Sequence, residues 1–199
     1  GPGKHERKLR APRPYPTQLN LSGGTFTAAS FTRLSEGNSS SSSINVSGTA
    51  DVTLPAFPTT RGVGATASIT FDGGTLRPLA ASTTYMGGLT SAKIKVGGAT
   101  LDVGSGTDIT ITQSLLTDGV SLGGGLTKTG DGMLTLSGTN TYTGVTTVSN
   151  GTLRVNGLLS SSAVTVAAGG ALSGTGTVSS SVALSGTVSP GASVGTLNT

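Results

Sequence analysis

From residue 19 onward, apolar and polar residues alternate in short runs that break at glycine and then resume. The recurring unit is an apolar residue, any residue, an apolar residue, any residue, then small residues that include glycine, and a further apolar position. Clear copies read LNLSGGTF from Leu19, ITFDGGTL from Ile69 and IKVGGATL from Ile94. With weaker copies included, the units begin at residues 19, 44, 69, 94, 120, 146, 164 and 182, so the separations are 25, 25, 25, 26, 26, 18 and 18. This regularity is typical of a repeat protein.

Alternation with a period of two predicts β-strands, and glycine between two such runs predicts a sharp corner. A unit with two or three short strands cannot bury its own apolar face, but stacked units can pair in parallel and enclose ladders of Leu, Ile and Val. The chain is therefore predicted to be all-β, a right-handed parallel β-helix of about eight turns and about 40 Å in length. We expect one β-solenoid domain over residues 19–199, preceded by an extended tail over residues 1–18.

Three stretches interrupt the repeat and are predicted to be loops. They are the serine-rich Ser35–Ser43, the proline-containing Leu54–Gly62, and Leu76–Gly88, which carries Tyr85 and Met86. Proline lacks the N–H that a central strand donates, which excludes the second stretch from the ladder. The last turns lack such insertions, so the rod is expected to become narrower and smoother toward its C-terminus.

The composition fits an elongated protein with a thin core. The 199 residues include 33 Gly and no Cys, 34% are hydrophobic and 10% are charged. Abundant Val, Ile and Thr suit pleated, half-buried surfaces. The absence of cysteine excludes disulfides, thiolate catalysis and thiolate metal sites. No apolar run approaches the ~18 residues of a transmembrane helix, so no membrane span is predicted.

The formal net charge of +4 lies entirely in the N-terminal tail. Residues 1–16 hold five basic residues and one acidic residue, whereas residues 17–199 hold seven of each. Alternation of proline with cations favours an extended conformation, which can lie along a neighbouring subunit as a strand or clamp, bind an anion such as a glycan, or stay unstructured. Nucleic acid is not an expected partner, because the tail has one aromatic residue and the body has no basic face. The candidate contact residues of the tail are Lys4, Arg7, Lys8, Arg10, Arg13 and Tyr15.

One stretch carries a family resemblance. Residues 124–157, GGLTKTGDGMLTLSGTNTYTGVTTVSNGTLRVNG, resemble the autotransporter-associated β-strand repeat, also called the passenger-associated transport repeat. Val145 departs from the second glycine that usually follows YTG in that family. Ser173–Leu197 resembles the turns that follow the repeat, so residues 124–199 are autotransporter-repeat-like. The resemblance implies a bacterial passenger that folds as a parallel β-helix, is secreted or held at the cell surface, and carries a repeat that aids transport and folding and has no catalytic residues.

The acidic residues do not predict an enzyme. A glycan-cleaving β-helix needs paired carboxylates, or a base with Arg or metal ligands, on one face. Asp51, Asp72 and Asp102 occupy different phases of the repeat, so we expect them to stay apart and to cap their own turns. His5 is the single histidine and has no triad partner. No catalytic residue, cofactor or metal site is predicted.

Two further patterns are assigned to structure. The glycine runs at residues 123–125 and 130–132 precede no helical period, which a phosphate-binding loop requires. Lys93 and Lys95 flank Ile94 and are predicted to be solvated on the outer face of a strand.

The ends of a solenoid expose strand edges that recruit another chain unless they are capped. The sequence shows no charged or amphipathic cap, and two open ends of the same architecture can pair head to tail into a filament. We therefore predict a structural subunit of an extracellular fibre, with the chain itself as its main partner and the tail bridging subunits. The alternative is a passenger fragment that acts as a stalk or an adhesin, whose loops contact a glycan or another cell-surface ligand; an enzyme ranks third. The candidate end-stacking residues are Leu19, Leu21, Val188, Val194 and Leu197.

Overall fold

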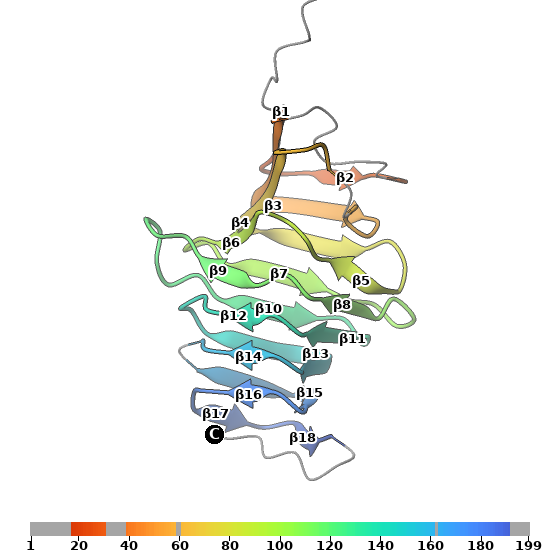
Figure 1. The fold of residues 1–199 in the computed structure, drawn as a ribbon. Coiled ribbons are helices and arrows are strands. Elements are labelled where there is room, and N and C mark those ends of the chain that lie inside the picture. Colours follow the sequence, from red (N-terminus) through yellow and green to blue (C-terminus); the bar gives the residue numbers. More distant parts are fainter. Residues whose placement is uncertain (1–16, 31–38, 59–60, 162, 192–199) are drawn as a thin grey trace, which may run out of the picture.

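The computed structural model describes residues 17–30, 39–58, 61–161 and 163–191, which form an all-β solenoid of about seven turns (Figure 1). Every strand pairing between these residues is parallel, and none of them lies in a helix. The strands are β1 (Thr17–Leu21), β2 (Thr25–Thr27), β3 (Ser41–Leu54), β4 (Thr66–Pro78), β5 (Ser82–Met86), β6 (Ser91–Ile94), β7 (Ala99–Asp102), β8 (Ile109–Ile111), β9 (Leu115–Thr117), β10 (Leu126–Thr129), β11 (Met133–Leu136), β12 (Thr139–Asn140), β13 (Thr146–Val155), β14 (Leu158–Leu159), β15 (Val164–Gly174), β16 (Thr177–Val178), β17 (Val182–Leu184) and β18 (Thr187–Pro190).

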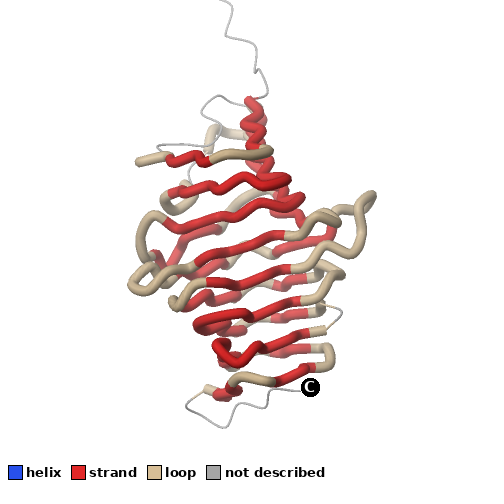
Figure 2. Tube along the Cα trace, turned by 180° about the vertical axis from the view of Figure 1, so that it is seen from behind, coloured by secondary structure: helices blue, strands red, loops and turns tan. Residues whose placement is uncertain are grey.

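The strands form three columns that run along the solenoid axis, and Figure 2 shows them stacked turn upon turn. The first column holds β1, the N-terminal halves of β3 and β4, then β6 and β9, and it continues in the small sheet of β12, β14 and β16. The second column holds β2, the C-terminal halves of β3 and β4, then β7, β10, the N-terminal halves of β13 and β15, and β17. The third column holds β5, β8, β11, the C-terminal halves of β13 and β15, and β18.

The parallel register stacks apolar side chains into internal ladders. In the first column, Ile44 pairs with Ile69, and both are buried in a single hydrophobic cluster that fills the solenoid. Because successive residues of a strand face opposite sides, each short strand sends only one or two side chains inward. Each fully buried aliphatic side chain contributes about 1.5–3 kcal/mol, so a few per turn hold a slender rod together.

The structure confirms the parallel solenoid, but it corrects the repeat. The copies that begin at residues 19, 44 and 69 are in register in the first column, as predicted. The copy at residue 94 is displaced by two positions, because Ile94 pairs with Phe71 rather than with Ile69. The copy at residue 120 is wrong, because Val120 and Leu122 are 94% and 62% exposed and belong to no strand.

The copies at residues 146, 164 and 182 are in register with one another, but they lie in the second column instead of the first. The long strands β3 and β4 bend across the corner between the first and second columns, whereas β13 and β15 bend across the corner between the second and third. At both corners, apolar and polar residues alternate in the strands on either side of a glycine. The same sequence pattern is therefore compatible with either corner.

The prediction of a loop over Leu76–Gly88 is wrong. Residues 76–78 end β4, residues 82–86 form β5, and Tyr85 and Met86 are fully buried. The sequence pattern did not predict this strand, because Ser82 and the two threonines after it are polar. Apolar and polar residues therefore do not alternate before Tyr85.

The stretch Leu54–Gly62 leaves the ladder after Leu54, as its prolines predicted, but it also covers an edge of the third column. The Phe57 N–H donates to the carbonyl oxygen of Tyr85 in β5 at 2.7 Å, and the two rings meet edge to face at 5.7 Å. Of the predicted serine-rich loop, residues 35–38 lie outside the described residues and Ser41–Ser43 begin β3.

The predicted narrowing is confirmed for the described turns. Paired positions 19, 44 and 69 are 25 residues apart, positions 126 and 146 are 20 apart, and positions 146, 164 and 182 are 18 apart. Loops flank the middle, green turns in Figure 1, and the lower, blue turns lack them.

Candidate functional site

The predicted contact residues fall partly outside the described chain. The tail from Lys4 to Tyr15 lies there, as do Val194 and Leu197. The remaining end-stacking residues, Leu19 and Leu21 in β1 and Val188 in β18, are partly buried against the hydrophobic core.

Both ends of the described solenoid present strands that are paired on one side. β1 and β2 pair with β3 alone, and β17 and β18 pair with β15 alone, among the residues that the structure describes. Leu184 in β17 continues the internal ladder below Val166, and 52% of it is exposed. An apolar side chain at the end of a ladder is the kind of surface that a further turn of β-strand would cover.

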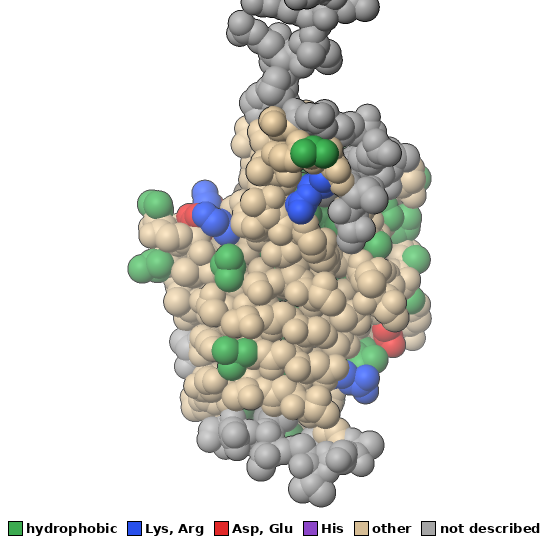
Figure 3. Space-filling model, viewed as in Figure 1, with side chains coloured by type: hydrophobic (Ala, Val, Ile, Leu, Met, Phe, Trp, Pro, Cys, Tyr) green, Lys and Arg blue, Asp and Glu red, His purple; other side chains and the backbone are tan. Residues whose placement is uncertain are grey.

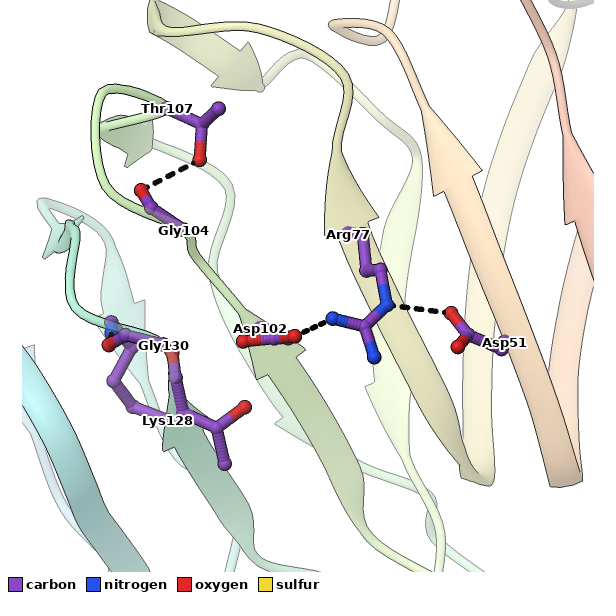
Figure 4. Close-up of polar contacts among 8 residues, drawn as sticks. Asp51, Arg77, Asp102, Gly104, Thr107, Lys128 and Gly130 are labelled. Atoms are coloured by element: carbon purple, nitrogen blue, oxygen red, sulfur yellow. Dashed lines mark hydrogen bonds and ion pairs between the residues drawn. The ribbon is translucent and has the colours of Figure 1, made fainter.

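Asp51 and Asp102 both bind Arg77, contrary to the prediction that they stay apart. Arg77 Nε donates to Asp51 Oδ1 at 2.8 Å, and Arg77 Nη1 forms an ion pair with Asp102 (Figure 4). The three residues come from β3, β4 and β7, which lie side by side in the second column. A register irregularity between Gly48 and Asp51 brings different phases of the repeat next to each other.

Asp72 and Asp108 cap backbone groups of the following turn, whereas Asp72 was predicted to cap its own turn. Asp72 Oδ1 accepts a hydrogen bond from Gly97 N at 3.0 Å, and Asp108 Oδ1 accepts one from Met133 N at 2.7 Å. With Asp51 and Asp102 both paired to Arg77, these four carboxylates brace neighbouring turns. In the described part of the chain, no group of three or more His, Cys, Asp or Glu side chains could hold a metal ion.

The Arg77 bridge is expected to contribute little to stability, because 42% of its side chain is exposed. Arg77→Met should lower the free energy of unfolding by about 0.5–1 kcal/mol at low salt and by less at high salt. Urea denaturation at two salt concentrations measures this. Lys95→Met is the control, since Lys95 forms no ion pair with a described residue.

Lys93 was predicted to be solvated on the outer face of its strand. Its Nζ lies 3.5 Å from Asp118 Oδ1, so it forms an ion pair.

A buried lysine lies in the stretch that carries the family resemblance. Lys128 in β10 is fully buried and lies beside Gly130 (Figure 4). Its Nζ donates to the carbonyl oxygens of Thr129 at 2.7 Å, Gly130 at 2.6 Å and Asn150 at 3.2 Å. The sequence reading missed it, because alternation from Leu126 to Lys128 is the only signal that this side chain points inward.

The same stretch buries further polar side chains, those of Tyr142, Thr146 and Asn140. The Tyr142 hydroxyl and Thr146 Oγ1 are 2.7 Å apart, and both residues are fully buried. Asn140 Oδ1 accepts from Leu115 N at 3.1 Å, and its Nδ2 donates to the carbonyl oxygens of Gly138 and Leu158 at 3.0 and 3.1 Å. The amide of Asn140 therefore joins three successive turns of the first column.

Burial lowers the pKa of Lys128 to about 8, and the nearby carboxylates of Asp131 and Asp108 oppose this shift. Between pH 8 and the ordinary lysine value, the unfolded chain binds more protons than the folded one, so stability should rise with pH, by at most about 1.4 kcal/mol per pH unit. Urea denaturation from pH 7.5 to 9.5 measures the rise. Lys128→Met should remove it; the same slope in that variant would contradict the assignment.

An ordered loop displays aliphatic side chains beside the first column. In the loop between β9 and β10, Val120 and Leu122 are 94% and 62% exposed, and Val96 on the preceding turn is 67% exposed. Val96 N donates to Ser121 Oγ at 3.0 Å, which holds the loop against that turn. Figure 3 shows hydrophobic side chains at the protruding left edge, where Figure 1 places this loop.

Residues 126–155 match the Passenger-associated-transport-repeat family. The match runs from β10 to β13 and includes the buried Lys128, Asn140, Tyr142 and Thr146. No curated protein and no solved structure matches the chain. The matched repeat and the solenoid fold suggest an autotransporter passenger-like domain, and domains with this repeat are typically structural or adhesive. The repeat also suggests an extracellular or surface location. Among the described residues, no helix is long and apolar enough to cross a membrane.

Proposed function

We propose that the chain is a structural subunit of a bacterial surface fibre, in which the C-terminal strands of one copy pair with the N-terminal strands of the next. Residues 1–16 bridge adjacent copies in this proposal, and no catalytic activity is part of it. The observation that carries it is the pair of one-sided strand edges, with Leu184 half exposed at one end and Leu19 and Leu21 partly buried at the other.

The chemistry of the two ends supports a head-to-tail contact. Parallel strands of the same columns can continue across the junction, so each backbone group finds the partner that it has inside the solenoid. A contact between two different surfaces of the same molecule does not close on itself unless the rotation happens to form a ring, and it therefore extends into a filament.

Electron microscopy of the chain at increasing concentration tests the proposal. We expect filaments with a subunit rise of roughly 35 Å, from about seven turns at ~4.8 Å each. Leu184→Lys should abolish them, since a charge at the end of the apolar ladder opposes burial. Leu122→Lys, which places the same charge on the exposed loop, should leave them intact. Short rods of one length in all three proteins would overturn the proposal, and unaffected filaments without residues 1–16 would remove the bridging role of the tail.

The exposed loop between β9 and β10 supports a second candidate, adhesion to a surface ligand. Exposed aliphatic side chains held in place by backbone contacts are typical of binding surfaces. If the chain is an adhesin, Val120→Ser together with Leu122→Ser should reduce its binding to cells or glycan arrays and leave filament formation unchanged.

A further inference from the structure

Lys128 interrupts an otherwise apolar ladder in the second column. Its inward position lies between Leu101 in β7 and Val148 in β13, and Val148 is followed by Val166 in β15. These three neighbours are almost completely buried, and so is Lys128. An ammonium group in this position needs hydrogen-bond acceptors, because a buried charge without partners is strongly destabilising.

The acceptors are three backbone carbonyls at the corner between the second and third columns. Thr129 and Gly130 belong to the same turn as Lys128, whereas Asn150 belongs to the next turn. Lysine offers three donors and no acceptor, so one ammonium group can satisfy all three oxygens.

Backbone atoms crowd this corner closely. Gly151 has a φ of +65°, and a Cβ at this position would lie 2.5 Å from the carbonyl oxygens of both Gly130 and Gly132. The corner thus gathers carbonyl oxygens from two turns around the end of the Lys128 side chain. The Thr129 carbonyl also accepts from Val103 N at 3.0 Å, so the lysine supplies its second hydrogen bond. A buried carbonyl that is left without any donor costs about 1–3 kcal/mol.

The lysine lies where the architecture of the solenoid changes. Between positions 126 and 146 the turn shortens to 20 residues, and from β13 onward the long strands bend at the corner between the second and third columns. The contact with Asn150 joins the last turn of the wide half to the first turn of the narrow half.

We propose that the carbonyls of Thr129, Gly130 and Asn150 form a binding site for a primary ammonium ion, that Lys128 is its built-in occupant, and that the occupied site fixes the wide half in register on the narrow half. A site of this kind accepts any primary alkylammonium ion that reaches it once the lysine side chain is shortened.

Lys128→Ala with added n-propylammonium chloride tests this proposal at pH 7. The variant removes three methylene groups and the ammonium group, which n-propylammonium replaces. The readout is hydrogen exchange at Gly132 N, which donates to Val103 O, and Thr152 N, which donates to Gly132 O, on either side of the site. We expect exchange at these amides to become at least about tenfold faster in the variant, and n-propylammonium to restore most of the protection.

Two controls separate occupancy of the site from filling of a cavity. n-Propanol has a similar size but no charge and should restore little protection. Leu101→Ala opens a cavity in the same ladder and should respond no more to n-propylammonium than to n-propanol. Equal rescue of Lys128→Ala by the alcohol, or no rescue by the ammonium ion, would overturn the proposal.

If Lys128→Ala does not fold, its refolding yield is measured instead, once with n-propylammonium and once with n-propanol. A higher yield with n-propylammonium supports the proposal, and equal yields or no gain with n-propylammonium would overturn it. Lys128→Met provides a further test, because it fills the volume without a donor. Wild-type protection at the two corner amides in that variant would show that the ammonium group does not fix the register.

Discussion

Gly157→Ala is expected to destabilise the chain by about 4 kcal/mol, a loss of the size seen when a substitution forces the backbone to move. A Cβ at this position would lie 2.2 Å from the carbonyl oxygen of Gly138 on the turn above. Gly157 cannot shift away, because its N–H donates to Leu136 O at 3.1 Å and its carbonyl accepts from Thr177 N at 2.9 Å. The substitution should therefore break hydrogen bonds on both sides of its turn.

Gly119→Ala is the matched control for this effect. No atom outside its neighbours lies within 4 Å of a Cβ at Gly119, and its φ is not in the left-handed region. The free energy of unfolding of the Gly119→Ala variant should change by no more than about 0.5 kcal/mol. Urea denaturation followed by circular dichroism measures both variants. A Gly157→Ala protein as stable as Gly119→Ala would mean that the turns are not stacked as closely as described.

Tyr142→Ala is expected to cost about 3–5 kcal/mol, the range for removing a large buried aromatic side chain. Tyr142 is fully buried directly before β13, inside the family-matched stretch, and its hydroxyl lies 2.7 Å from Thr146 Oγ1. The cavity would border the strand that pairs with both β10 and β15, so the loss should spread to both neighbouring turns. Thermal and urea unfolding measure it.

Tyr142→Phe separates the ring from the hydroxyl. It keeps the packing and removes one hydrogen bond, so we expect a loss of about 1 kcal/mol. Burial raises the pKa of Tyr142 above its usual value. The unfolded chain therefore releases this proton first, and stability should fall as pH rises above about 10. The stability of Tyr142→Phe should fall less steeply above this pH. A similar loss of stability for Tyr142→Ala and Tyr142→Phe at neutral pH would show that the ring is not packed as described.

These effects give the family-matched stretch a physical role. Several of its polar residues are buried, and among them Lys128 joins carbonyls of two turns and Asn140 joins three turns of the first column. The stretch therefore holds the wide and narrow halves of the solenoid together, which agrees with a structural role for the repeat.

Local patterns along the chain were enough to predict the class of fold. Alternation with period two fixes which side chains of a strand face inward, and a glycine step between two such runs marks a corner. Those local rules were sufficient to predict a parallel solenoid, to place Leu19, Ile44 and Ile69 in one ladder, and to exclude the stretch after Leu54 from the strands. Residues 124–157 predicted the family match at 126–155.

The column that each strand joins could not be predicted from the repeat and is set by pairing between turns. The copies at 69 and 146 read alike, yet one bends at the first corner and the other at the second, a difference that the repeat pattern does not encode. The same choice brought Asp51 and Asp102 to Arg77 and buried Lys128 against Asn150. Contacts between turns depend on the register between residues about 20 to 25 apart, and a local pattern sets only the inward or outward direction of each side chain.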